Sequence, residues 1–184
     1  MTISKINCSE IIIDTINTPL GVMLAGVTNN SLCLLSFLND NEQTIENIDV
    51  KQRWSGYSKF GKHEILNLIR KQLDEYFVGK RQVFTVPLDL YGTEFQCSVW
   101  QELIKIPYGV CYSYQEQAKI LGKPKAVRAV ANANRQNRIA IVVPCHRVIG
   151  KNGHLTGYRA GIWRKKELLA LEQNIAKKQA AYTL

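Results

Sequence analysis

The chain has 184 residues, of which 46% are hydrophobic and 21% charged, so its composition is that of a globular protein and argues against disorder. No apolar run is long enough to cross a bilayer, and the polar start of the chain lacks the features of a signal peptide. We therefore expect a cytoplasmic protein of one large domain or two small ones, with no membrane contact.

The positive charge is confined to the second half of the chain. Residues 1–90 hold 9 Lys and Arg against 10 Asp and Glu, a net charge of −1. Residues 91–184 hold 15 against 5, a net charge of +10. Such asymmetry is typical of nucleic-acid binding, although a solvated basic surface would give the same count.

The cysteines indicate free thiols. Their scattered positions suit a reducing compartment better than a disulfide framework, and no Cys/His cluster has the spacing of a zinc site. We therefore expect no metal and no cofactor. The five cysteines are Cys8, Cys33, Cys97, Cys111 and Cys145.

The first half of the chain predicts a small structural domain, residues 1–90. Three apolar runs within residues 10–38, separated by turn residues, predict a β-meander. Residues 62–77 predict an amphipathic helix, with a stripe of apolar side chains at i+4 spacing. A further strand is expected at residues 83–88, at a sheet edge because of Pro87. The predicted helix stripe consists of Ile65, Ile69, Leu73 and Phe77.

The second half, residues 91–184, predicts short helices. One starts near Thr93, and a second starts at the capping box of Ser113 and Glu116 and runs to Leu121. A Gly-Lys-Pro break separates the second from a third, at residues 125–134. Helix, tight turn and helix form the layout of a helix-turn-helix, although many helical hairpins share it.

The third helix carries small side chains around one arginine. Ala126, Ala129 and Ala133 lie at i, i+3 and i+7, and Arg128 is the long side chain among them. A face this small lets a helix approach another surface closely. The pattern also suits a tightly packed core helix with Arg128 in solvent, but the basic half-chain favours a DNA-facing surface.

A possible nucleophile follows the apolar run at residues 139–143. This β-branched run predicts a buried strand that ends at Pro144, directly before Cys145, His146 and Arg147. Cys145 would then sit at a rigid strand end, although an isolated buried cysteine is more often inert. Adjacent side chains on an extended segment point in opposite directions, so we do not expect His146 to touch Cys145 directly.

The last predicted helix, residues 161–174, has a mixed face. Lys165, Leu168, Leu169 and Glu172 share one side of it, and the two leucines direct that side toward the core. A buried carboxylate needs a partner, and His146 is the obvious candidate.

Together these motifs resemble the O6-alkylguanine-DNA alkyltransferases. The resemblance covers residues 92–172, and over residues 1–90 it extends only to layout and length. It implies an α+β fold, with a small N-terminal antiparallel sheet and helix in a ribonuclease-H-like layout and a mostly helical C-terminal winged helix-turn-helix. The matching parts are, in order, Phe95 and Trp100, then residues 112–115, 122–130, Asn137, and residues 144–148, 157–159 and 164–169.

The resemblance also implies a chemistry. Such a protein transfers the alkyl group of O6-alkylguanine, and of O4-alkylthymine, in double-stranded DNA to its own cysteine, once per molecule. Cys145 would attack the alkyl carbon, His146 would act through a water relay, and Glu172 would orient the imidazole. Tyr114 would give a proton to the leaving guanine, and Asn137 would stabilise the loop around the pocket.

The same resemblance assigns the remaining site residues. Lys165 would help to keep the thiolate charged. Val148, Tyr158 and Arg159 would form the base pocket. Arg128 would fill the space left by a base flipped out through the minor groove. The other DNA contacts implied are Tyr114, Lys125, Ala126 and Ala129. The resemblance further implies a monomer, at the nucleoid of a prokaryote or in a eukaryotic nucleus.

Two other functions compete with alkyl transfer. A non-catalytic helix-turn-helix binder would share the basic half but would not need Cys145. A Cys-His hydrolase would need a direct contact between thiol and imidazole and an oxyanion hole, and the adjacent positions of Cys145 and His146 disfavour that contact.

Overall fold

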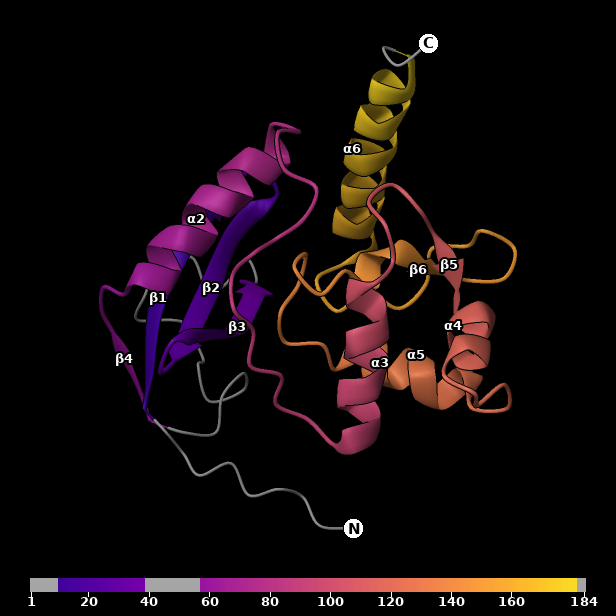
Figure 1. Cartoon of the computed structure of the whole chain (residues 1–184), viewed down its shortest axis with the longest axis horizontal. Helices are drawn as coiled ribbons and strands as arrows, with labels where there is room; N and C mark the ends of the chain where they lie inside the picture. The colour runs from indigo at the N-terminus through magenta and orange to yellow at the C-terminus, as the bar shows by residue number, and fades with distance from the viewer. Residues whose placement is uncertain (1–9, 39–56, 182–184) are drawn as a thin grey trace. The chain divides into compact units, whose positions relative to one another are not determined.

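The structure, a computed structural model, describes residues 10–38 and 57–181. The chain forms two compact units, residues 1–93 and residues 94–184 (Figure 1). The described part of the first unit holds a sheet and a helix, and the second unit is mostly helical. This mixed α+β fold confirms the class predicted from the sequence.

The first unit is built on a four-stranded sheet. Strands β1 (Ile11–Thr18), β2 (Gly21–Thr28) and β3 (Ser31–Phe37) form the predicted antiparallel meander. A short strand, β4 (Ser58–Phe60), pairs in parallel with β1, so the sheet order is β3-β2-β1-β4. The sequence did not predict β4, because three mostly exposed residues show no apolar alternation.

Helix α2 (Glu64–Phe77) packs on this sheet (Figure 1). Its start is capped by His63, whose Nδ1 accepts a hydrogen bond of 3.1 Å from the Ile65 amide. The predicted stripe is partly wrong, because Ile65 and Phe77 lie at the margin of the buried face. Steps of four residues drift by about 40° each around a helix of 3.6 residues per turn. The buried apolar side chains are Leu66, Ile69, Leu73 and Tyr76.

The predicted strand at residues 83–88 is wrong. Only one bridge forms, between Leu32 and Leu88, and Val83 is 73% exposed. Side-chain hydrogen bonds hold the segment instead: Gln72 accepts from the Thr85 amide at 3.0 Å and donates to the Thr85 hydroxyl at 2.6 Å. The first of these contacts satisfies the Thr85 amide, which could otherwise pair with a neighbouring strand.

The second unit contains the predicted helices. The predicted capping box is present, since the Ser113 hydroxyl accepts from the Glu116 amide at 3.1 Å and the Glu116 carboxylate accepts from the Ser113 amide at 2.6 Å. Trp100 fixes α3 to α5 through a 2.8 Å hydrogen bond to the Ala133 carbonyl. The elements are α3 (Glu94–Ile104), β5 (Tyr112–Ser113), α4 (Tyr114–Ile120), α5 (Val127–Arg135), η3 (Cys145–Arg147), β6 (Val148–Ile149) and α6 (Ile162–Ala181).

Helix α5 does not expose the predicted row of alanines. Ala133 is only 2% exposed and lies on the same side as Val130, at the core. The exposed side instead carries Arg128, Asn132 and Arg135. These positions lie within about 60° of one another around the helix axis, so Arg128 shares its face with a second arginine.

Among the described residues, no helix has the length and apolar character needed to cross a membrane.

Candidate active site

The segment before Cys145 is buried but is not a strand, so that prediction is wrong. Its amides bond locally: Val142 donates to the Ala140 carbonyl at 2.9 Å, and Cys145 donates to the Val143 carbonyl at 2.8 Å. Ile141 has a φ of 70°, which breaks an extended run. Cys145 then begins the short 3-10 helix η3.

Asn137 explains why this segment turns. Its side-chain oxygen accepts from the Ile139 amide at 2.9 Å, and its Nδ2 donates to the Val143 carbonyl at 2.8 Å. The same Nδ2 lies 3.2 Å from the sulfur of Cys145. The side chain of Asn137 therefore satisfies backbone groups that a neighbouring strand would have satisfied, and it also donates to the thiol.

Cys145 is a buried thiol with 9% of its surface exposed. Burial raises the pKa of Cys145, while the hydrogen bond from Asn137 and the charge of Lys165 act in the opposite direction. At neutral pH the resting sulfur therefore keeps its proton. Nucleophilic attack from this position needs a group that accepts the proton.

His146 and Glu172 form the predicted pair. Histidine Nε2 lies 2.9 Å from Glu172 Oε1, and both side chains are fully buried. Burial lowers the pKa of His146, and this outweighs the attraction of Glu172. Burial alone would raise the pKa of Glu172, but its contacts with His146 and Arg147 hold that pKa well below the usual range. We conclude that the pair rests as a neutral imidazole and a carboxylate.

The remaining imidazole nitrogen is available for proton transfer. Among the described residues, Nδ1 of His146 is buried without a protein hydrogen-bond partner. No hydrogen bond joins the imidazole to the sulfur of Cys145 within the described chain. The sequence predicted this lack of contact from the alternation of side chains along a strand. In the structure it arises because consecutive side chains of a 3-10 helix point about 120° apart.

Sequence reasoning missed Arg147. Its Nε and Nη2 donate to the two oxygens of Glu172, each at 2.9 Å. Its Nη1 donates to the Ile106 carbonyl at 2.6 Å, and the Gly109 amide donates to Glu172 at 3.0 Å. The available signal was its position next to His146, because a second cation beside a buried carboxylate is a second candidate partner.

Lys165 is fully buried beneath the site. Its ammonium donates to the Val148 carbonyl at 2.6 Å and to the Thr156 carbonyl at 3.0 Å, and it lies 5.7 Å from the centre of the Tyr114 ring. Burial lowers the pKa of Lys165, whereas Cys145 raises it. Lys165 therefore fixes β6 to the segment before α6 and places positive charge near the thiol.

A cavity of about 320 Å³ opens between α5 and the segment at Thr156 and Gly157. The Tyr114 hydroxyl donates to the Thr156 carbonyl at 3.2 Å across it. Gly157 has a φ of 60°, a conformation that favours glycine. The cavity is lined by Tyr114, Ala131, Asn132, Arg135, Thr156 and Gly157.

The predicted pocket residues Val148, Tyr158 and Arg159 are not among the residues that line this cavity. Val148 is fully buried, and Arg159 is exposed. The Tyr158 hydroxyl is buried without a protein hydrogen-bond partner among the described residues. Burial, followed by the nearby Cys145, raises the pKa of Tyr158 well above its usual value. Sequence reasoning missed Asn132 and Arg135, whose positions on α5 gave no sign that this side of the helix borders a cavity.

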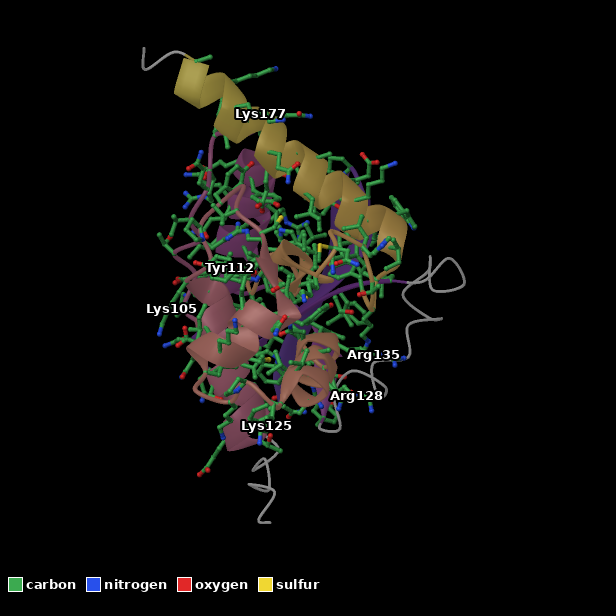
Figure 2. All side chains as sticks on the ribbon, turned by 90° about the vertical axis from the view of Figure 1, so that its right-hand side faces the viewer. Lys105, Tyr112, Lys125, Arg128, Arg135 and Lys177 are labelled. Atoms are coloured by element: carbon green, nitrogen blue, oxygen red, sulfur yellow. The ribbon has the colours of Figure 1, made fainter. Side chains whose placement is uncertain are left out.

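The basic side chains of α5 and of the residues just before it are exposed to solvent. Figure 2 shows Lys125, Arg128 and Arg135 at one end of the second unit, away from Lys177 near the far end of α6. All three are exposed, as is Ala129, while Ala126 is half-buried at the helix start. The exposed arginines therefore lie on the same helix that borders the cavity.

The described thiols and acidic groups do not form a metal site. Over residues 10–38 and 57–181, no three His, Cys, Asp or Glu side chains come close enough to hold an ion. Cys33, Cys97, Cys111 and Cys145 are free thiols, and Cys8 lies outside the described residues.

Two family descriptions match successive parts of the chain. Residues 11–90 match the ribonuclease-like domain of 6-O-methylguanine DNA methyltransferase, and residues 94–174 match the DNA-binding domain of the same family. The chain belongs to the 6-O-methylguanine DNA methyltransferase family. The resemblance predicted from the sequence is confirmed, and it extends over the first half as well.

Relatives and solved structures of this family cover nearly the whole chain. A methylated-DNA–protein-cysteine methyltransferase of Methanosarcina barkeri is 42% identical over 161 residues, which cover 88% of this chain and 96% of the relative. A constitutive enzyme of the same name from Bacillus subtilis is 42% identical over 166 residues, covering 88% and 92%.

The fold agrees with crystal structures of the Mycobacterium tuberculosis protein. Its O6-methylguanine methyltransferase is 43% identical and superimposes with a TM-score of 0.76, covering 89% of this chain and 93% of that one. A structure of Mycobacterium tuberculosis OGT in complex with DNA is 40% identical, with a TM-score of 0.74, covering 90% and 94%.

Proposed function

We propose that this methyltransferase-family protein repairs DNA by moving the alkyl group of O6-alkylguanine onto Cys145, irreversibly and once per molecule. The observation that carries the proposal is the buried Cys145 thiol, held by Asn137 next to the paired His146 and Glu172. Relatives named methylated-DNA–protein-cysteine methyltransferases support it. O4-alkylthymine, whose alkyl carbon is likewise bound to an exocyclic oxygen of the base, is a second proposed substrate.

Each bond formed in the transfer is matched by a bond that breaks, and each proton has an acceptor in the site. The sulfur of Cys145 forms a bond to the alkyl carbon as the bond from that carbon to guanine O6 breaks. The thiol proton passes to Nδ1 of His146 through water, and Glu172 stabilises the imidazolium that forms. The leaving guanine receives a proton from the Tyr114 hydroxyl, and the proton held by His146 returns to Tyr114 through water, so that both side chains end neutral. The thioether left on the cysteine is stable, and no described thiol is positioned to release it.

The route of the base follows from the exposed arginines. We propose that α5 lies against double-stranded DNA and that the damaged base flips into the cavity beside Tyr114. The half-buried Tyr158 and the exposed Arg159, which follow the cavity-lining Gly157, then approach the base from this side. A crystal structure of a relative in complex with DNA supports DNA as the partner.

We further propose how the protein is organised and where it works. Residues 91–184 carry the DNA contacts and the chemistry, and residues 1–90 serve as a structural domain. One copy contains every site residue named above, so the protein acts as a monomer. Its substrate places it with the DNA, in the cytoplasm at the nucleoid of a prokaryotic cell.

A duplex with one O6-methylguanine tests the proposal. We expect each protein molecule to gain a single methyl group, detected in the mass of the intact protein and assigned to Cys145 by peptide mapping. The same duplex with unmodified guanine is the control and should leave the mass unchanged. Repeated turnover by one molecule, or a methyl group on Cys97 or Cys111, would contradict the proposal.

Glu172→Gln is expected to raise the apparent pKa of the Cys145 thiol. Without the carboxylate, His146 is a weaker base and supports the thiolate less well. The rate of thiol alkylation should therefore rise at higher pH than in the wild type. The variant should also lose about 3–5 kcal/mol of stability, because Arg147 is left as a buried unpaired cation.

Glu102→Gln is the matched control for this prediction. Glu102 pairs with Lys105 at the surface, at 2.6 Å, so its loss should change neither the alkylation profile nor the stability by much. If the Glu172→Gln profile equals that of the wild type in folded protein, the contact between His146 and Glu172 does not act on the thiol.

A further inference from the structure

Four hydrogen bonds meet on the buried carboxylate of Glu172. Oε1 accepts from His146 and from Arg147 Nη2, and Oε2 accepts from Arg147 Nε and from the Gly109 amide, all at 2.9–3.0 Å. Arg147 is 5% exposed, and its guanidinium also lies 5.7 Å from the centre of the Tyr108 ring. Both oxygens are thus bound in fixed directions, and Arg147 supplies half of the donors.

This arrangement divides one negative charge between two partners. A buried carboxylate that had only an imidazole beside it would favour the protonated imidazole, because an unpaired buried charge is costly. Arg147 is permanently charged and binds both oxygens, so it already neutralises Glu172. Protonation of His146 would then place a second positive charge beside Glu172, and no second carboxylate would neutralise it.

We propose that Arg147 is a positioning residue for alkyl transfer, which holds Glu172 in place and takes up its charge so that His146 rests as a neutral base. The inference rests on the proposed function, since it assigns to His146 the proton of Cys145. The bond from Arg147 to the Ile106 carbonyl, in the turn after α3, helps to hold the guanidinium in this position.

The other charged and titratable groups around His146 do not replace Arg147. Lys165, on α6, also disfavours the charged imidazole, but it donates to main-chain carbonyls and not to Glu172. Tyr108 and Cys111 lie near Glu172, and burial raises the pKa of each, to about 12 for Tyr108, so both are neutral. Cys145 itself is the proton donor. Arg147 is therefore the cation that binds the carboxylate directly.

Arg147→Gln tests the proposal. Removing the guanidinium charge should raise the pKa of His146, because Glu172 then has only the imidazole to neutralise it. Nuclear magnetic resonance can follow the titration directly, since the chain has three histidines and a His146→Gln variant identifies the signal. In single-turnover methyl transfer, the rate near pH 6 should fall on the order of tenfold relative to the rate near pH 8.5.

Matched variants separate this role from a structural one. Arg147→Lys keeps the charge but loses the paired bonds, so it should lower the melting temperature and shift the His146 titration less than Arg147→Gln does. Arg70→Gln removes an arginine that binds Asp14 at 2.7 Å on the surface of the first unit, and it should leave His146 unchanged.

A second comparison covers the case in which Arg147→Gln does not fold. Arg147→Gln added to Glu172→Gln leaves a neutral pair, which is less costly than one buried charge. The His146 pKa should be higher in this double variant than in Glu172→Gln alone. An unchanged or lowered His146 titration, or a lower melting temperature with no change in the pH profile, would overturn the proposal. The titration needs no DNA, so it remains decisive even if methyl transfer from the duplex fails.

Discussion

Cys145→Ala is expected to abolish methyl transfer and to leave DNA binding intact. The variant lacks the thiol that Asn137 contacts at 3.2 Å, directly before His146 in the chain. In our proposal binding depends instead on exposed cations such as Arg128 and Arg135, which the substitution does not touch. We expect no methylated protein after incubation with the alkylated duplex, and an affinity for undamaged duplex within about 0.5 kcal/mol of the wild type.

A second cysteine variant is the control for the expected separation of methyl transfer from DNA binding. Cys111→Ala removes another partly buried thiol of the same unit and should keep full methyl transfer. Both variants are compared by intact-protein mass and by binding to undamaged duplex at one fixed salt concentration. If Cys145→Ala lost affinity for undamaged DNA as strongly as it lost methyl transfer, the thiol would be part of the DNA-binding surface.

Arg128→Ala is expected to slow repair of duplex DNA far more than reaction with a free base. If Arg128 fills the space left by a flipped guanine, its loss removes compensation for unstacking, which costs a few kcal/mol. The single-turnover rate on alkylated duplex should then fall on the order of a hundredfold. A free alkylated guanine needs no flipping and should react nearly as before, and single-stranded DNA should be intermediate.

Two further variants, at Lys125 and Arg128, distinguish base flipping from general DNA binding. Lys125→Ala removes an exposed cation in the turn just before α5, so it should weaken binding to all DNA alike and lower the salt slope by about one unit. Arg128→Lys should recover little, because a compact ammonium cannot stack as a planar guanidinium can. Equal losses on duplex and on free base would show that Arg128 supports the fold or the pocket and not the flip.

Local patterns in the sequence were enough to predict most of the elements. Alternating apolar runs between turn residues predicted the meander of the first unit, and the capping box at Ser113 predicted where α4 begins. Helical periodicity placed Lys165 and Glu172 on one buried face of α6, and the cost of a buried charge pointed to His146 as a partner. Each of these inferences depends on residues close in sequence or on one strong energetic rule.

Predictions failed where a contact from outside the segment decided the backbone. The β-branched run before Cys145 favours a strand, but the Asn137 side chain binds its amides and carbonyls and bends it. In the predicted strand at residues 83–88, the Gln72 side chain likewise binds a backbone amide, that of Thr85. A pattern of apolar residues reports burial, but it does not report which group satisfies the backbone.

The sequence by itself determined the family and the basic half of the chain, and it predicted Cys145 as the nucleophile, because these depend on residue types at short spacings. Only the tertiary structure joined Arg147 to Glu172 across 25 positions and Tyr114 to Thr156 across 42. It also decided that Arg135 borders the cavity with Gly157. These contacts depend on how α5, η3 and α6 pack together. Residues that packing brings into contact from distant parts of the chain do not form a periodic pattern in the sequence.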